Sequence, residues 1–256
     1  MLAIDRRDEV TVVRLQHGPV NALDLELLQA LNAALAEVSG PLVLTGTGRS
    51  FSAGVDLRRI VDGDEHYAVA FLAALSDMFL AVFDHPAPTV AAVNGHAIAG
   101  GCVLALACDL RLMAAGRIGL TELAVGVPFP SAAREIARYA LGPAVSRVVL
   151  RADTLEAEDA VRVGLVDDVV THDELLDSAV ALASRVGGHD AAVYAFEKGR
   201  LHRTAREAVA AVDDRDVVRA WTSPVAKDRL RAQLAKLGRG DRPVEGPEGP
   251  RTQRPQ

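Results

Sequence analysis

Hydrophobic and polar positions alternate with the period of β-strands at the start of the chain, and then with the period of a helix. Residues 2–7 and 10–16 are strand-like runs, and Asp8-Glu9 between them predicts a tight turn and hence a hairpin. Asp24 then provides an N-cap for a helix that extends to about residue 37. The leucines of this segment recur at helical spacing and predict one buried face: Leu23, Leu27, Leu28, Leu31 and Leu35.

Two short apolar runs, residues 41–45 and 88–93, predict buried strands, and small residues follow each of them. The turn GTGRSFSAG leads from the first run to a helix that begins near Asp56. The residues NGH turn the second run, and Ala99-Gly100-Gly101 then opens the apolar helix CVLALAC. The chain therefore repeats a pattern of strand, turn and helix.

The remaining segments continue the alternation of strands and helices, which indicates α/β architecture. We expect strands over residues 109–114, 118–120 and 165–170, and helices over residues 65–83, 131–141, 144–151 and 156–163. Residues 1–190 are assigned to a core, and the mainly helical residues 191–237 to a packing or oligomerisation region. Eight of the last nineteen residues, 238–256, are Gly or Pro, which predicts a disordered tail.

Composition narrows the classes of function. With 256 residues, of which 50% are hydrophobic, the chain can form one large domain with a sizeable core. A net charge of −6 argues against nucleic acid as the main partner, because phosphate binding needs a basic surface. No run reaches the roughly 18 apolar residues that span a bilayer, and the charged start MLAIDRRDEV lacks a secretion signal. We therefore expect a cytoplasmic protein without membrane or nucleic-acid partners.

Common catalytic and cofactor motifs fail in this sequence. Cys102 and Cys108 lack the spacing of metal ligands and are expected to be small buried residues in a reducing compartment. The GTG after the first strand lacks the third glycine of a dinucleotide fingerprint, and GHAIAGG lacks the Lys and Ser/Thr of a phosphate loop. No HExxH occurs, and the nucleophile elbow around Ser50 fails at its last glycine. We expect no metal site and no serine hydrolase.

The two turns FSAGVDL and NGHAIAGGC carry the candidate chemistry. The first amides of a helix have no intrahelical partner and favour negative charge, and small residues let a ligand approach them. Two such amides facing one cavity would stabilise an oxygen that gains negative charge during a reaction. Structural roles compete with this interpretation: Gly54 can supply a positive φ, Gly100-Gly101 can allow close helix packing, and Asp56 can be only an N-cap.

Three segments, in this order and spacing, resemble the crotonase superfamily, also called enoyl-CoA hydratase/isomerase: FSAGVDL, VNGHAIAGGCVLALACDLRL and TELAVGV. The resemblance extends from the first hairpin to about residue 235 and includes PVNAL and LVDDVV. It implies a spiral core of repeated ββα units, a helical C-terminal trimerisation region, and a homo-oligomer, either a trimer or a hexamer. It also implies an acyl-CoA substrate, with coenzyme A as part of the thioester and no separate cofactor.

The resemblance assigns roles to residues one by one. It implies that the backbone amides of Val55 and Gly100 hold the thioester oxygen and that Glu122 is the catalytic carboxylate, matching Thr121-Glu122 to a PE-type pair of the family. By family position, the substrate contacts are Ala22, Ala53, Gly54, Asp56, Leu57, Gly101, Val103, Thr121 and Gly126.

One family carboxylate is missing. Hydratases of the superfamily use two glutamates, and the position of the first, three residues after Gly100, is Val103 here. A single base suffices to move a double bond, and single-glutamate members of the superfamily include 3,2-enoyl-CoA isomerases. Dienoyl-CoA isomerases carry an aspartate eight residues after the glutamate, where this chain has Pro130. Glu135 between two arginines predicts a helix-surface ion pair, and His66 is a weaker candidate for substrate contact.

Three hypotheses follow. The first is an enoyl-CoA isomerase with an enolate held in an oxyanion hole and Glu122 as base. The second is an enoyl-CoA hydratase in which another group replaces the missing glutamate. The third is an acyl-CoA-binding protein that keeps the fold without the chemistry, and Val103 is the feature that supports it.

Overall fold

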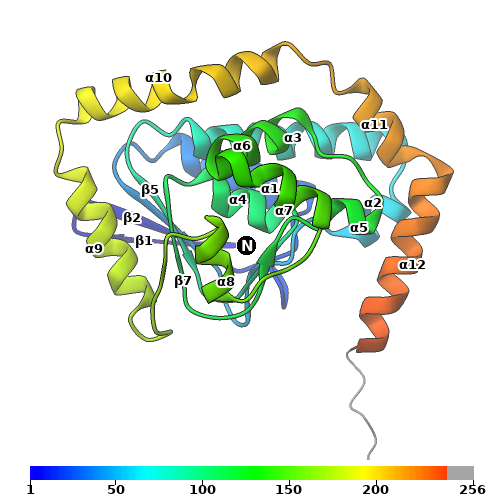
Figure 1. Cartoon of the computed structure of the whole chain (residues 1–256), viewed down its shortest axis with the longest axis horizontal. Coiled ribbons are helices and arrows are strands. Elements are labelled where there is room, and N and C mark those ends of the chain that lie inside the picture. Colours follow the sequence, from blue (N-terminus) through cyan, green and yellow to red (C-terminus); the bar gives the residue numbers. More distant parts are fainter. Residues whose placement is uncertain (241–256) are drawn as a thin grey trace, which may run out of the picture.

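The fold is organised around a six-stranded sheet (Figure 1). The computed structural model describes residues 1–240. The strand order is β1-β2-β3-β5-β7-β9, with β1 and β2 antiparallel and the other neighbours parallel. The strands are β1 (Leu2–Arg7), β2 (Val10–Leu15), β3 (Leu42–Thr45), β5 (Thr89–Val93), β7 (Leu110–Met113) and β9 (Asp168–Val169). The predicted hairpin and the two predicted buried strands are confirmed.

A second, smaller sheet has three parallel strands in the order β4-β6-β8. These are β4 (Ser50–Ser52), β6 (His96–Ile98) and β8 (Ile118–Gly119). Each follows one strand of the large sheet and precedes a helix, so the predicted ββα unit occurs three times. The three helices are α2 (Leu57–Asp62), α4 (Gly100–Ala107) and α5 (Glu122–Val125).

The small sheet corrects the interpretation of two segments as turns. Strand β4 lies inside GTGRSFSAG, and β6 lies inside NGHAIAGG. Strands of two or three residues are too short for an alternating pattern to be visible in the sequence. Helix α5, with four residues, is likewise too short to show a helical period and was not predicted. The strand expected over residues 165–170 is shorter in the structure, where β9 has two residues.

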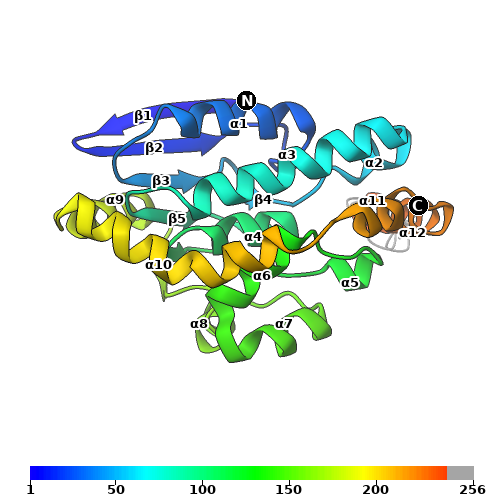
Figure 2. The same cartoon turned by 90° about the horizontal axis from the view of Figure 1, so that it is seen from above.

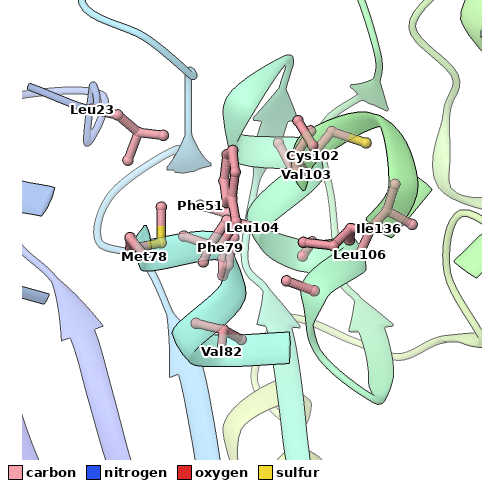
Figure 3. Close-up of a cluster of buried hydrophobic side chains, with 14 of the residues drawn as sticks. Leu23, Phe51, Met78, Phe79, Val82, Cys102, Val103, Leu104, Leu106 and Ile136 are labelled. Atoms are coloured by element: carbon pink, nitrogen blue, oxygen red, sulfur yellow. The ribbon is translucent and has the colours of Figure 1, made fainter. Parts of the chain in front are cut away.

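Helices cover both faces of the large sheet. Helix α9 (Leu175–Gly187) packs its Leu175, Ala179 and Ala183 on one face, where the sheet presents mainly valines. The other face carries the main core, in which α4 is buried along its whole length between neighbouring helices (Figure 3). The neighbours are α3 (Glu65–Phe83) and α6 (Ser131–Leu141), and α1 (Leu25–Ala36) packs against α3. Asp24 caps α1 by accepting from the amide of Leu27, as predicted.

Helix α3 corrects an expectation about membranes. It has 19 residues and a mean hydropathy of 1.7 over its most apolar window, so by length and composition alone it could cross a bilayer. Eight of its residues are buried, among them Phe71, Met78 and Phe79 of the main core, whereas Val69 is exposed. Packing against the core therefore accounts for the apolar residues on one face of this helix.

The C-terminal third of the chain is helical, as predicted. The chain continues through a short 3-10 turn (Gly142–Ala144), α7 (Val145–Arg151) and α8 (Ala157–Val163) to α10 (Ala191–Ala210), α11 (Arg215–Thr222) and α12 (Pro224–Gly240). Figures 1 and 2 show α11 and α12 beside α2 and α5 at one end of the molecule. Helix α12 includes residues 238–240, the start of the predicted tail, and residues 241–256 lie outside the described part.

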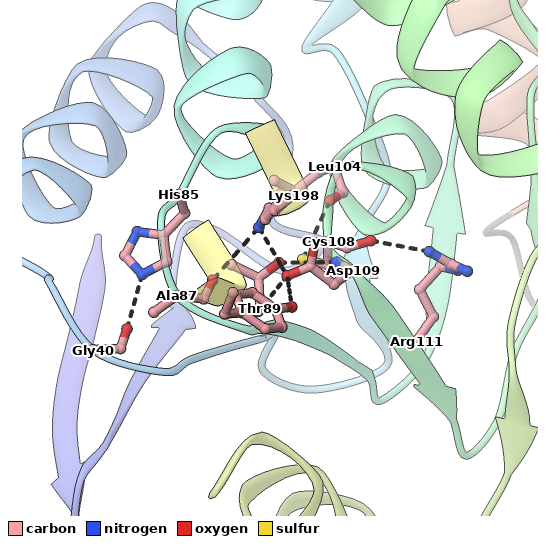
Figure 4. A network of polar contacts seen from close by, with 10 residues as sticks. Gly40, His85, Ala87, Thr89, Leu104, Cys108, Asp109, Arg111 and Lys198 are labelled. Carbon is pink, nitrogen blue, oxygen red and sulfur yellow. Dashed lines mark hydrogen bonds and ion pairs between the residues drawn. The ribbon is translucent and has the colours of Figure 1, made fainter. Parts of the chain in front are cut away.

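A buried ion pair attaches α10 to the large sheet (Figure 4). Oδ2 of Asp109 accepts hydrogen bonds from the Lys198 ammonium at 2.8 Å and from the Tyr194 hydroxyl at 3.1 Å. The same oxygen accepts from the amide and the hydroxyl of Thr89 at the start of β5. Both charged side chains are largely buried, so the pair depends on its partners for stability.

We expect Lys198→Met to lower the free energy of unfolding by about 2–3 kcal/mol, because it leaves the Asp109 carboxylate buried with only neutral donors. Urea unfolding at pH 7 measures this loss. Arg203→Met on the same helix is the matched control, since Arg203 forms an exposed pair with Glu207 and should cost less than about 0.5 kcal/mol. Equal losses in the two variants would contradict the structural role of Lys198.

Candidate active site

The two glycine turns that the sequence singled out lie side by side. Gly54 has φ +82°, and a side-chain carbon added there would lie 3.2 Å from the amide nitrogen of Gly100. A side-chain carbon added at Gly100 would in turn lie 3.7 Å from Cγ2 of Val55. The fold produces this proximity because β4 and β6, the strands that lead into the turns, are neighbours in the small sheet.

The N–H of Val55 points away from Leu23, whose backbone pairs with this part of the turn. Leu23 donates to the carbonyl of Gly54 at 2.8 Å and accepts from the amide of Asp56 at 2.9 Å. Since successive amides of an extended chain point in opposite directions, the Val55 N–H between them faces the other side. No acceptor for it is found within residues 1–240.

The amide of Gly100 is free for a different reason. Gly100 is the first residue of α4, so its N–H has no acceptor in the helix. Ala99 before it adopts φ 50° and ψ −119°, which is unusual for a residue with a side chain and commonly marks a functional position. The helix dipole adds partial positive charge at this end. Together, the two amides can hold an oxygen that gains negative charge.

A polar network holds the first turn in place. The buried Asn21 donates from its side-chain amide to the carbonyl of Ser50 at 2.9 Å. The Ser52 hydroxyl donates to the carbonyl of Asn21 at 2.7 Å and accepts from the amide of Gly54 at 3.2 Å. The PVNAL segment therefore fixes the backbone of FSAG from behind, and the sequence contained that segment without showing this role.

A cavity of about 200 Å³ opens from the two turns. Its lining combines backbone of the turns with residues of seven helices: Ala53, Val55, Leu57, Leu75, Phe79, Ile98, Ala99, Gly100, Val103, Thr121, Glu122, Val125, Val127, Pro130, Ala133, Trp221 and Gln233. Most of these residues are apolar. A larger cavity of about 780 Å³ under α10 contains none of the predicted site residues.

Glu122 is the one ionisable residue among the residues 1–240 that line the smaller cavity. Its side chain is the first of α5 and only 7% of the residue is exposed. Oε2 of this carboxyl group has no hydrogen-bond partner in the described part of the chain. Burial raises the pKa of Glu122 to about 8, because the charged form loses its hydration. A carboxyl group with a pKa near neutrality can accept and return a proton.

The structure places the predicted residues in two groups. Seven line the cavity: Ala53, Val55, Leu57, Gly100, Val103, Thr121 and Glu122. The other five do not belong to the lining, and their contact with substrate stays a prediction. Asp56 caps α2, Gly126 ends α5 against the Arg229 side chain, Gly101 packs on the backbone of Ser52, Gly54 separates the two turns, and Ala22 is half-buried before Leu23.

The positions of the additional family carboxylates face the cavity but carry apolar residues. Val103 and Pro130 both belong to the lining. Glu135 is only 6% exposed, so the expected surface position is wrong, although the expected ion pairs with Arg134 and Arg138 are present, each at 3.0 Å. Glu135 and the exposed His66 are both outside the cavity lining.

Residues 60–80, a segment that the family resemblance places at the acyl pocket, supply Leu75 and Phe79 of α3 to one side of the cavity. Sequence reasoning missed the walls from the C-terminal helices, where Trp221 of α11 and Gln233 of α12 close another side. The Trp221 indole donates to the carbonyl of Pro128 at 2.8 Å, and Lys227 of α12 donates to the carbonyl of Gly63 at 2.7 Å. The single tryptophan of the chain was a usable signal, because large buried aromatics often line ligand sites.

The described part of the chain has no cluster of residues that could bind a metal ion. Among residues 1–240, no group of three or more His, Cys, Asp or Glu side chains could hold an ion. Cys102 and Cys108 are free thiols and both are buried, as the sequence predicted. Burial raises the pKa of both thiols, which keeps them protonated.

Comparisons with known proteins agree with the motifs. The profile of the family "Enoyl-CoA hydratase/isomerase" matches residues 5–234. A putative enoyl-CoA hydratase from Thermus thermophilus is 38% identical over 63% of this chain and 66% of its own length. A solved enoyl-CoA isomerase from Mycobacterium tuberculosis is 30% identical and covers 91% of this chain and 98% of its own, with a TM-score of 0.76.

A human mitochondrial delta3-delta2-enoyl-CoA isomerase superimposes with a TM-score of 0.89 over 94% of this chain and 99% of its own. At 24% identity, that likeness is evidence for the fold alone.

Proposed function

The chain belongs to the enoyl-CoA hydratase/isomerase family, and from that premise we propose that it shifts the double bond of a 3-enoyl-CoA to the conjugated 2-enoyl position. The family and the enzyme class rest on the matches described above. The choice of isomerisation rests on one observation: residues 1–240 supply the cavity with a single carboxyl group, Glu122, and the position of a second one is Val103.

The geometry supports a sequence of two proton transfers. The Glu122 carboxylate removes a proton from C2 of the substrate, and the electron pair of that C–H bond moves toward the thioester carbonyl. The enolate oxygen then accepts hydrogen bonds from the amides of Val55 and Gly100. The Glu122 carboxylic acid returns the same proton to C4, so the double bond moves and no water or cofactor is consumed.

Desolvation helps Glu122 in this role. A buried carboxylate with one oxygen that lacks a hydrogen-bond partner in the described residues is a stronger base than a hydrated one, as its raised pKa expresses. The apolar walls also exclude the water that an addition reaction would need. Hydration requires both a positioned nucleophile and a proton donor. Besides Glu122, the long polar side chain that residues 1–240 supply to the lining is Gln233, and an amide cannot act as the second acid or base.

We propose in addition that the enzyme works as a homo-oligomer, a trimer or a hexamer. Three apolar residues of α10 support association, since Val193, Phe196 and Leu201 are each more than 60% exposed. We propose that coenzyme A enters only as part of the substrate and that no separate cofactor is needed. The reaction as written needs neither an oxidant nor a metal.

The test is a product assay with 3-hexenoyl-CoA. We expect conversion to 2-hexenoyl-CoA, which is monitored by the absorbance of the conjugated thioester. Hydration of crotonyl-CoA should be at least about 100-fold slower than this isomerisation. Faster hydration than isomerisation would favour the hydratase. Binding of acyl-CoA without turnover, and without exchange of C2 protons in deuterated water, would make the protein a binder.

A further inference from the structure

The acyl end of the cavity is small and uncharged. Beyond the two turns and Glu122, its walls are mainly apolar side chains of α3, α4, α6 and α11, among them Phe79, Val103 and Ala133. The polar side chains of Thr121 and Gln233 also belong to the lining, and both are uncharged. No Arg, Lys or His belongs to the lining that residues 1–240 supply. A negatively charged substituent on the acyl chain would therefore lose its hydration without gaining a cationic partner.

The volume limits the length of the chain. An apolar cavity of about 150 Å³ accommodates one benzene ring, so about 200 Å³ has room for roughly eight non-hydrogen atoms. Because Val55 and Gly100 belong to the lining, the sulfur, carbon and oxygen of the thioester occupy part of this space. Room for about five further carbons is left, which corresponds to a six-carbon acyl group.

The walls are held in place by packing and hydrogen bonds. Phe79 lies in the middle of the 19-residue helix α3 and is 1% exposed. The Trp221 indole is fixed by its hydrogen bond to the carbonyl of Pro128. Gly126, at φ +87°, ends α5 against the Arg229 side chain. Widening the cavity for a long chain would break these contacts, and close-packed interiors resist that.

We propose that the substrates are enoyl-CoA thioesters with a short, unsubstituted hydrocarbon chain of about four to six carbons. The proposal rests on the proposed function for the reaction, but the selection of chain length concerns binding and can be measured separately. It excludes long fatty acyl chains and chains that end in a carboxylate.

A series of 3-enoyl-CoA substrates tests the length limit. We expect kcat/KM to rise about 15-fold from the four-carbon to the six-carbon substrate, since each of the two added methylenes contributes about fourfold when buried. It should then fall at least about tenfold from the six-carbon to the twelve-carbon substrate, which does not fit. An equal or higher kcat/KM for the twelve-carbon substrate would overturn the proposal.

Saturated thioesters separate this proposal from the proposed function, because they bind and do not react. We expect hexanoyl-CoA to bind at least about tenfold more tightly than dodecanoyl-CoA in calorimetry, and heptanoyl-CoA about 100-fold more tightly than adipyl-CoA, whose chain ends in a carboxylate. If the protein shows both binding preferences but has no isomerase activity, the proposed substrate class is supported and the proposed reaction is wrong. Equal affinities for both pairs, or no binding, would overturn the substrate class.

Two variants test whether the residues of the cavity wall set the limit on acyl chain length. Ala133→Val adds two carbons inside the cavity and should lower the six-carbon to four-carbon ratio of kcat/KM at least about fivefold. Ala140→Val, on the same helix but facing the larger cavity, carries the same helix penalty and should leave the ratio unchanged. Trp221→Leu should raise the twelve-carbon to six-carbon ratio about tenfold. An unchanged ratio in Ala133→Val would overturn the assignment of these walls.

Discussion

Glu122→Gln is expected to lower kcat for isomerisation by about 10³- to 10⁴-fold, since an amide of the same shape cannot accept the C2 proton. The protein should remain folded, because the side chain it replaces makes no ion pair and one of its oxygens has no partner in the described residues. Steady-state assays with 3-hexenoyl-CoA measure the loss. Affinity for saturated acyl-CoA should change less than about threefold, because the two backbone amides are untouched.

Glu135→Gln is the matched control for this substitution. Glu135 is as buried as Glu122, but it is paired with Arg134 and Arg138 outside the cavity. We expect its kcat to stay within about threefold of the parent protein. A Glu122→Gln enzyme that keeps more than a tenth of its activity would show that another group moves the proton.

The same substitution should stabilise the protein at high pH. The pKa of Glu122 is about 8 in the folded state, above its value of 4.5 when unfolded. Between these values the unfolded chain releases a proton that the folded chain keeps, so the stability of the parent protein falls as pH rises. Glutamine has no such proton, and the stability advantage of Glu122→Gln should grow by about 5 kcal/mol between pH 4 and pH 9.

Urea unfolding of both proteins at pH 4 and pH 9 measures that margin. Other ionisable groups are common to the two proteins and largely cancel in the difference. A margin that is the same at both pH values would mean that Glu122 has an ordinary pKa in the unliganded protein. In that case the desolvated base would form only when substrate closes the cavity.

The sequence predicted those parts of the site that lie close together along the chain. Asp24, the leucines of α1 and the extent of α3 follow from local pattern, and the structure confirms them. The two turns were visible because glycine and alanine cluster between a buried strand and a helix. Their proximity came from the family resemblance, since nothing local in FSAGVDL shows that β4 pairs with β6.

The walls from α11 and α12 could not be predicted, because these helices are distant in the sequence from the two turns. Trp221 follows Gly100 by 121 residues and lines the same cavity. The helices 191–237 were assigned to packing or oligomerisation, yet α11 and α12 also line the cavity of their own chain. A hydrophobic pattern shows that a helix face is buried, but not what it is buried against.

Gly54→Ala is expected to lower kcat by about 10²- to 10³-fold, the usual cost of losing one donor from an oxyanion hole. Alanine at φ +82° is strained, and its side-chain carbon would lie 2.5 Å from the carbonyl oxygen of Ile98 and 3.2 Å from the amide nitrogen of Gly100. The turns must move apart to relieve this contact, and the Val55 and Gly100 amides would no longer converge on one oxygen. Affinity for saturated acyl-CoA should fall less than kcat does, since its carbonyl carries less charge than the enolate.

Gly48→Ala is the control that distinguishes the effect of displaced amides from the effect of backbone strain alone. Gly48 has φ +65°, and a side-chain carbon there would have no atom of residues 1–240 within 4 Å. Both variants should lose about 1 kcal/mol of folding free energy from the unfavourable φ, but only Gly54→Ala should lose most of its kcat. If the two variants keep the same kcat, the approach of the two turns has no part in catalysis. Retained acyl-CoA binding with a reduced kcat in Gly54→Ala would instead show that the two amides act mainly on the enolate.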